Sequence, residues 1–176
     1  MTTSIRPANG EDAAALAALA AATFALACPP GTTQKAVDDF LASSLSETSF
    51  ARYIKDSQRL VLLACDGEAA VGYAMLVFSE PTDPNVLASI TVRPTSELSK
   101  LYVLADHHGA GVSSALVDAG VAAARERGCV AMWLGVNQLN LRANRFYEKS
   151  GFVRVGTKTF ALGGKLEEDF VRERLL

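Results

Sequence analysis

The chain has 176 residues, of which 49% are hydrophobic, so its size and composition fit one domain with a real core and exclude a disordered chain. Its 17 basic and 19 acidic residues give a formal charge of −2, which excludes a strongly basic surface for nucleic acid or anionic lipid. Cys28, Cys65 and Cys129 lack the spacing of a zinc site or a disulfide framework, so we expect a protein of the reducing cytoplasm.

The first third of the chain predicts one short strand followed by helices. Residues 5–7 predict the strand, and a long alanine-rich helix should follow Glu11 and Asp12, whose charges suit a helix N-terminus. The apolar run 13–28 is shorter than the ~20 residues of a membrane span, and no secretory signal precedes it. We therefore expect a helix of a soluble protein, with two shorter helices in 32–54.

The middle of the chain predicts strands. Two apolar runs, 59–65 and 69–78, flank Asp66-Gly67, a dipeptide typical of an antiparallel hairpin. Further strands are predicted at 89–92 and 97–104.

The remaining residues alternate between helix and strand. A helix is predicted from Val112 to Gly128, a strand at 129–136, a helix from Asn140 to Lys149, and one or two strands in 152–176. This order predicts one α/β (α+β) domain over residues 1–176, with helices packed on a mixed sheet.

A glycine-containing turn joins the strand at 97–104 to the following helix. It reads His107, His108, Gly109, Ala110, Gly111, Val112, Ser113, Ser114. Two residues without a Cβ let a ligand approach the backbone, and the first N–H groups of a helix carry positive partial charge, so a pyrophosphate could bind there. A plain tight turn is the alternative interpretation. Adjacent histidine side chains diverge, so we expect no metal site.

Asn140 and Tyr147 form a second candidate site. They lie seven residues apart, two turns along one helix, and therefore on the same side of it. They could contact one ligand. Alternatively, Asn140 is an ordinary helix N-cap and Tyr147 is a core ring with its hydroxyl at the surface.

Three stretches together resemble the GNAT N-acetyltransferase superfamily. They are Leu101-Tyr102-Val103, the turn 108–113, and Asn140-x-x-Ala143-x-x-Phe146-Tyr147-Glu148-Lys149-x-Gly151-Phe152. The resemblance implies a mostly antiparallel, twisted sheet of about six or seven strands with helices on both faces, and acetyl-CoA as cosubstrate. The implied cofactor-binding residues are Leu101, Tyr102, Val103, His108, Gly109, Ala110, Gly111, Val112, Ser113, Asn140 and Tyr147.

Shorter stretches resemble the bacterial polyamine-acetylating branch of this superfamily. They are Trp133-Leu134-Gly135-Val136, Gly156-x-x-x-Phe160-x-Leu162-Gly163 and the segment around Asp169. Two positions depart from the usual pattern of the turn: His108 replaces a glutamine or arginine, and Ser113 replaces a smaller residue. Because backbone N–H groups make most of such a cradle, we expect cofactor binding to persist.

The resemblance also assigns chemical roles. Tyr147 would supply a proton to the departing thiolate, and backbone N–H groups near Val103 would donate to the acetyl oxygen. Glu97 is the candidate base that deprotonates the amine, on the same strand face as Ser99 and Leu101. At ~3.3 Å per residue it begins roughly 13 Å from Leu101, so it would act only through water or on a long substrate. A solvated glutamate is the alternative.

The acceptor and the partners are less defined by the sequence. Asp38, Asp39 and Glu47 in the early helices would suit a polycation, and a solvated helix face explains them equally well. Acceptors left open are a polyamine, another small amine and a protein amino group. A non-catalytic acyl-CoA-binding or sensor module and an interaction scaffold are the alternative functions. We expect no nucleic-acid or membrane partner, and a homodimer stays open.

Overall fold

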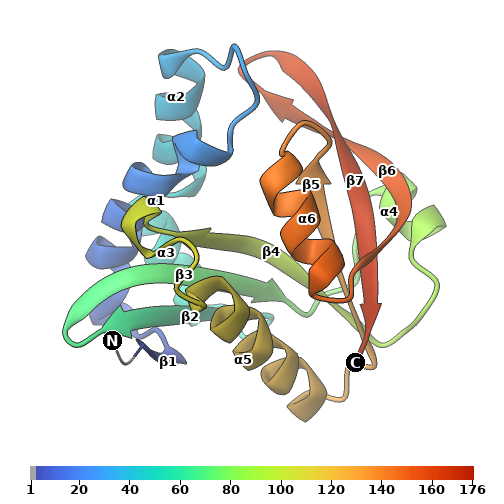
Figure 1. The fold of residues 1–176 in the computed structure, drawn as a ribbon, viewed down its shortest axis with the longest axis horizontal. Helices are drawn as coiled ribbons and strands as arrows, with labels where there is room; N and C mark the ends of the chain where they lie inside the picture. The colour runs from blue at the N-terminus through green and yellow to red at the C-terminus, as the bar shows by residue number, and fades with distance from the viewer. Residues whose placement is uncertain (1–2) are drawn as a thin grey trace.

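The computed structural model describes residues 3–176 and contains a seven-stranded sheet in the order β1-β2-β3-β4-β5-β7-β6 (Figure 1). The strands are β1 (Thr3–Pro7), β2 (Arg59–Asp66), β3 (Ala69–Val77), β4 (Thr95–Val103), β5 (Ala131–Asn137), β6 (Val153–Leu162) and β7 (Lys165–Leu175). All neighbouring strands are antiparallel except β4 and β5, which are parallel. The prediction of a mixed, mostly antiparallel sheet is confirmed.

Several of the helices begin where a polar side chain accepts from a free backbone N–H group. The helices are η1 (Gly10–Asp12), α1 (Ala13–Ala27), α2 (Gln34–Ser44), α3 (Glu47–Lys55), α4 (Pro84–Ser89), η2 (Ala105–His107), α5 (Val112–Glu126) and α6 (Leu141–Lys149). Asn9 and Asp12 form a reciprocal capping box before α1, and Ser46 accepts from the Ser49 N–H at the start of α3. The two short helices predicted in 32–54 are therefore present.

The sheet buries apolar side chains on both faces. On one face, Leu16, Phe24 and Phe50 of α1 and α3 pack against strand residues that include Tyr73, and we call this the α1–α3 core. On the other face, Leu116 of α5 packs with residues of β2 to β5, and α6 adds its partly buried aromatic side chains. The expected placement of helices on both faces is confirmed (Figure 1).

Helix α1 covers the alanine-rich run predicted from the sequence. Together with η1 it forms an 18-residue stretch, Gly10–Ala27, with a mean hydropathy of 1.3, which is long and apolar enough to cross a membrane by length and composition alone. The predicted run itself corresponds to α1, whose 15 residues stay below the ~20 of a membrane span, and only the addition of η1 reaches 18. Leu16, Leu19, Ala20 and Phe24 are nonetheless buried against the sheet and α3. A helix packed into a protein core meets the same criterion, so the finding is weak evidence for a span.

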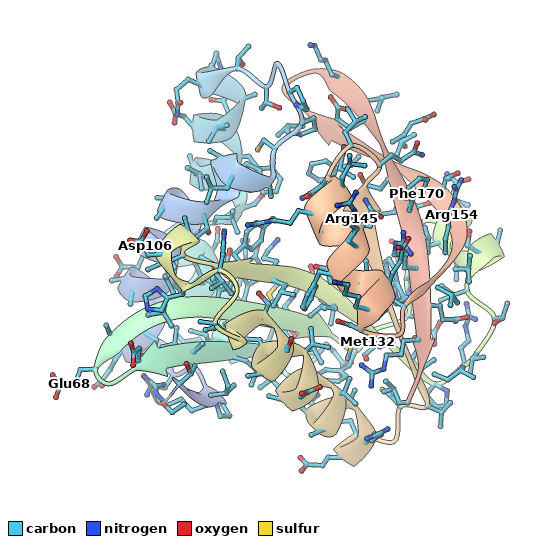
Figure 2. All side chains as sticks on the ribbon, in the orientation of Figure 1. Glu68, Asp106, Met132, Arg145, Arg154 and Phe170 are labelled. Carbon is cyan, nitrogen blue, oxygen red and sulfur yellow. The ribbon has the colours of Figure 1, made fainter. Side chains whose placement is uncertain are left out.

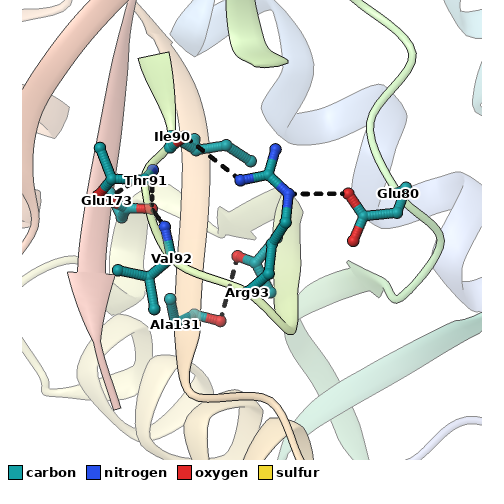
Figure 3. A network of polar contacts seen from close by, with 8 residues as sticks. Glu80, Ile90, Thr91, Val92, Arg93, Ala131 and Glu173 are labelled. Atoms are coloured by element: carbon teal, nitrogen blue, oxygen red, sulfur yellow. Dashed lines mark hydrogen bonds and ion pairs between the residues drawn. The ribbon is translucent and has the colours of Figure 1, made fainter. Parts of the chain in front are cut away.

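The strand predicted at residues 89–92 is absent from the structure. Asp83 caps a short helix, α4, and Pro84 occupies its first turn, so the chain is helical up to Ser89. The buried Glu173 carboxylate then accepts from the Thr91 N–H at 3.1 Å and from the Thr91 hydroxyl at 2.8 Å (Figure 3). A side chain thus satisfies the backbone that a neighbouring strand would otherwise pair.

Strands β4 and β5 pair only at their beginnings. Thr95 to Glu97 align with Ala131 to Trp133, and beyond these residues the two parallel strands diverge. On its other edge, β4 contains a bulge: Met75 of β3 pairs with Lys100, while the next residue of β3 pairs with Leu98, which leaves Ser99 as the extra residue. The divergence, which we call the splay, opens the sheet in its middle.

Candidate active site

The bulge in β4 decides which side chains share a face of the sheet. The β3 partners of Glu97 and Lys100 both belong to the α1–α3 core, so these two residues lie on that face together with Tyr102. Leu98 and Leu101 pack on the opposite face, with α5. The prediction that Glu97 shares a face with Leu101 is wrong, because regular alternation is interrupted by one residue.

The splay leaves peptide groups of β4 without a strand partner. The Leu104 N–H donates to the Val71 carbonyl of β3 at 2.9 Å. Since N–H groups alternate in direction along an antiparallel strand, those of Leu101 and Val103 point away from β3 and into the splay. These two residues can therefore pair with an extended ligand as a neighbouring strand would.

The turn before α5 forms a cradle of free N–H groups. Gly109 and Gly111 adopt φ values of +81° and +83°, a left-handed conformation that favours glycine. Within residues 3–176, the N–H groups from Gly111 to Ser114 meet no protein acceptor. No acidic residue occupies the first turn of α5, so the positive end of the helix is unopposed. This geometry suits a phosphate or pyrophosphate.

His108 connects the end of β4 to α6 across the mouth of the cradle. Its Nε2 lies 2.8 Å from the Val103 carbonyl, and its Nδ1 lies 2.5 Å from a guanidinium nitrogen of Arg142. Arginine can only donate, so Nδ1 accepts and Nε2 carries the hydrogen that is donated to Val103. The neutral ring thereby holds Arg142 beside the cradle. The neighbouring His107 instead lies 3.8 Å from Asp66, so the two histidines diverge as expected.

A cavity of about 340 Å³ extends from the cradle to the splay. Of the predicted cofactor residues, ten line it: Leu101, Tyr102, Val103, His108, Gly109, Gly111, Val112, Ser113, Asn140 and Tyr147. Ala110 is exposed on the turn and is not part of the lining. The predicted turn also included Ser114, which lines the cavity, whereas sequence reasoning missed the α1 wall (Thr23, Leu26, Ala27) and Arg142. Ala143 and Phe146 also line the cavity, and their place in the α6 motif could have indicated them.

Asn140 and Tyr147 each stabilise the fold around α6 and also line the cavity. The Asn140 side chain accepts from the Ala143 N–H at 3.1 Å, so it caps α6, while it also borders the cavity. The Tyr147 ring contacts Phe146 and Phe152, with ring centroids 5.4 and 5.9 Å away. Burial raises the pKa of Tyr147 well above that of free tyrosine. Its hydroxyl is therefore protonated at neutral pH and can donate a hydrogen bond.

A second cavity of about 260 Å³, which we call the acceptor chamber, lies on the other side of Tyr147. Both cavities are lined by Ala27, Leu101, Tyr102, Asn140, Ala143 and Tyr147. The two spaces thus meet at the splay, where the unpaired peptide groups of β4 face Tyr147. One end of this path is the N–H cradle, and the other is the acceptor chamber.

Four charged side chains line the acceptor chamber. Glu97 and Lys100 come from β4, and the Lys158 ammonium of β6 lies 3.6 Å from the buried Asp169 carboxylate of β7. Burial raises the pKa of Glu97, although Lys158 and Lys100 oppose the rise, and burial lowers the pKa of Lys100. Glu97 is thus a stronger base than an exposed glutamate.

Gly135 of β5 provides the room for the Lys158 side chain. A Cβ at residue 135 would lie 2.4 Å from the Lys158 Cε, so a larger residue there would displace this lysine. The chamber therefore holds an ammonium group beside β5.

The acidic residues of the early helices lie outside the acceptor chamber. Asp38 accepts from Gln34, and Asp39 pairs with Lys35 on the exposed surface of α2. Glu47 is likewise exposed, in the first turn of α3. Instead, these elements contribute aromatic side chains: Phe24 and Phe40 stack with ring centroids 4.5 Å apart and form one wall. The interpretation of a solvated helix face fits these carboxylates.

Comparisons with solved structures support the fold. The PaiA N-acetyltransferase of Thermoplasma acidophilum, in complex with coenzyme A, superposes with a TM-score of 0.80 over 100% of both chains at 19% identity. The ribosomal-protein-S18-alanine N-acetyltransferase of Escherichia coli gives a TM-score of 0.70 at 17% identity, over 99% of this chain and 94% of that one. At these identities the likeness concerns the fold.

Sequence comparisons establish the family. The model of the acetyltransferase (GNAT) family matches residues 26–152. An uncharacterised N-acetyltransferase of Mycobacterium tuberculosis is 44% identical over 165 residues, which cover 94% of this chain and 98% of that protein. The chain therefore belongs to the acetyltransferase (GNAT) family, and its enzyme class is N-acetyltransferase.

Proposed function

We propose that this enzyme transfers the acetyl group of acetyl-CoA to the primary amine of a small molecule by direct attack on the thioester. One observation carries the proposal: the cradle cavity and the acceptor chamber meet at Tyr147, beside unpaired peptide groups of β4. Acetyl-CoA bound in the first cavity would place its thioester at this junction. The amine would approach the thioester from the acceptor chamber.

The cofactor would bind along the first cavity. Its pyrophosphate accepts from the free N–H groups at the start of α5, and Arg142 adds a guanidinium beside them. Its pantetheine amides pair with the peptide groups of Leu101 and Val103. His108 thus contributes indirectly, through Arg142, although it replaces the glutamine or arginine usual at this position.

The amine must lose a proton before it attacks, because an alkylamine with a pKa of about 10 is protonated at neutral pH. Glu97 is the proposed base. It lines the acceptor chamber, and its burial makes the carboxylate more basic. The distance of roughly 13 Å along β4 to Leu101 calls for a chain of water molecules between Glu97 and the amine.

Attack of the neutral amine forms a bond to the thioester carbon and places negative charge on the acetyl oxygen. A backbone N–H at Leu101 or Val103 would donate to this oxygen. As the carbon–sulfur bond breaks, Tyr147 would donate its proton to the sulfur, which leaves as the thiol of coenzyme A, and the phenolate would take up the proton that the acetylated nitrogen loses. Because phenol is a weaker acid than a thiol, this proton transfer is concerted with bond cleavage.

The acceptor class that we propose is a small primary amine, of which a polyamine is one candidate. The acceptor chamber, at about 260 Å³, is smaller than the ~300–1,000 Å³ of sites for drug-sized ligands, which favours a small molecule. A protein amino group is the alternative, since its terminal residue alone could enter. The three free cysteines and the use of acetyl-CoA support the cytoplasm as the location.

The proposal is tested by measuring two products in the same reaction. Acetyl-CoA is mixed with the enzyme and with spermidine, alkylamines, amino acids or peptides, and free thiol and acetylated amine are quantified together. We expect one thiol per acetamide with at least one small amine. Protection of the enzyme against heat by acetyl-CoA, without any acetamide from this panel, would indicate a binding or sensor module instead.

A further inference from the structure

We infer that the physiological acceptor is an amine that also carries a carboxylate, with the carboxylate held by Lys100 and Lys158 and the amine directed towards β4. This inference rests on the proposed acetyl transfer and specifies its substrate. It excludes a simple polycation as the preferred acceptor.

Two opposite charges in the acceptor chamber, those of Glu97 and Lys100, have no ion-pair partner among residues 3–176. Among residues 3–176, no cation lies within 4 Å of the Glu97 carboxylate, and no carboxylate lies within 4 Å of the Lys100 ammonium. Neither side chain makes a hydrogen bond to another described residue. Charges in such a partly buried position are costly unless they are paired, and a ligand with both charges would pair them.

Lys100 and Lys158 lie along one aromatic wall of the acceptor chamber. The Lys100 ammonium lies 5.9 Å from the centre of the Phe40 ring, and the Lys158 ammonium lies 5.7 Å from that of Phe160. These two rings touch edge to face, with centroids 5.7 Å apart. Two cations therefore flank one aromatic pair, an arrangement that suits an anionic group bound by the ammonium groups themselves.

The acidic and basic side chains that line the acceptor chamber are equal in number. Glu97 and Asp169 contribute two negative charges, and Lys100 and Lys158 contribute two positive ones. Asp169 already faces Lys158 at 3.6 Å, a separation longer than a hydrogen bond, so a carboxylate can join this pair from the Lys100 side. A polyamine would bring further positive charge next to two lysines, which is unfavourable.

The size of the chamber limits the acceptor to a short molecule. Its volume of about 260 Å³ is bounded by the aromatic wall and by residues of β4 and β5. A free amino acid or an ω-amino acid of a few carbons fits these limits. A long polyamine would have to extend past Phe24 and Phe40 into solvent.

The test compares amines that differ only in the carboxylate. The intact enzyme is assayed with saturating acetyl-CoA and with 4-aminobutyrate against butylamine, β-alanine against ethylamine, and a set of α-amino acids, with spermidine and a peptide N-terminus alongside. We expect kcat/KM for the best carboxylate-bearing amine to exceed that of its matched alkylamine and of spermidine by about tenfold or more, the value of one charge-assisted hydrogen bond.

The variant K100M identifies the residue responsible. We expect it to lower the ratio of kcat/KM between the carboxylate-bearing amine and its alkylamine by about tenfold. K100E should shift the preference further, towards the alkylamine and spermidine. K55M, which replaces an exposed lysine at the end of α3, is the matched control and should keep the wild-type ratio. Retained thermal stabilisation by coenzyme A verifies that each variant is folded.

The outcomes separate this inference from the proposed function. Equal or faster acetylation of butylamine or spermidine would overturn the inference while leaving acetyl transfer intact. The same holds if a peptide N-terminus is the best acceptor, or if K100M leaves the ratio unchanged. Absence of stabilisation by coenzyme A and of thiol release with every amine would instead overturn the proposed function.

Discussion

His108 illustrates how a single residue can depart from a family pattern and still serve the same site. From the sequence, it replaces a glutamine or arginine of the turn, and cofactor binding was expected to persist through backbone N–H groups. In the structure the ring donates to the Val103 carbonyl and accepts from Arg142, which it holds at the cradle. Contacts 34 residues apart along the chain cannot be deduced from local spacing, so this compensation was not predictable.

Arg142 should therefore contribute to cofactor affinity. We expect Arg142→Gln to raise the Kd of acetyl-CoA about tenfold, because it removes a charge-assisted contact with phosphate. Arg145→Gln is the matched control, since Arg145 projects from the next turn of α6 and lines none of the cavities described above (Figure 2). Calorimetric titration measures both variants. Equal affinities for the two would mean that Arg142 does not touch the cofactor.

Tyr147 should act on the chemical step. We expect Tyr147→Phe to lower kcat about a hundredfold, the typical contribution of a positioned proton donor, and to change the KM of acetyl-CoA little. Burial raises the pKa of this phenol, so its titration should not appear in the pH profile of the wild-type enzyme below pH 9. The thiol-release assay measures the variant, and an unchanged kcat would remove Tyr147 from the mechanism.

At the level of the elements, hydrophobic patterns and turn residues identified most strands and helices. The Asp66-Gly67 turn and the glycine after α5 are local signals, and both were read correctly. The bulge at Ser99 and the helix in place of a strand before Thr91 were not. Both depend on partners from distant segments, β3 and Glu173, whose contacts leave no local pattern.

The bulge places Glu97 on the face of β4 that lines the acceptor chamber, and this position leads to a prediction about the pH dependence of the reaction. A base works only when it is ionised, and burial raises the pKa of Glu97, so kcat/KM should fall on acidification at a higher pH than the ordinary glutamate pKa of 4.5. Glu97→Gln should lower kcat/KM about a hundredfold at neutral pH and abolish this inflection. A profile that keeps the same inflection in the variant would assign it to another group.

Two controls accompany the pH measurement. Glu68→Gln, at the tip of the β2–β3 hairpin, should leave the profile unchanged (Figure 2). Because the folded state raises the pKa of Glu97, ionisation of this carboxyl disfavours folding as the pH rises. Glu97→Gln should thus unfold at no lower denaturant concentration than the wild type at pH 7, which separates a catalytic effect from misfolding.

At the scale of the whole molecule, the alternation of strands and helices was enough to predict a mixed sheet covered on both faces. The splay between β4 and β5 is the feature on which function depends, and it could be expected only from the family resemblance. The walls of the two cavities come from elements as distant as α1 and β7, so Leu26, Lys158 and their neighbours were assigned to the site only by the three-dimensional arrangement.

The central claim is that the cradle at the start of α5 binds the cofactor. Calorimetric titration of coenzyme A tests it most directly. An alanine at Gly111 would strain a backbone at φ +83° by about 1–2 kcal/mol without meeting a steric clash. We predict saturable binding to the wild type, about tenfold weaker binding to Gly111→Ala, and unchanged binding to the control Gly10→Ala. No binding to the wild type, or equal affinity of all three proteins, would contradict the account.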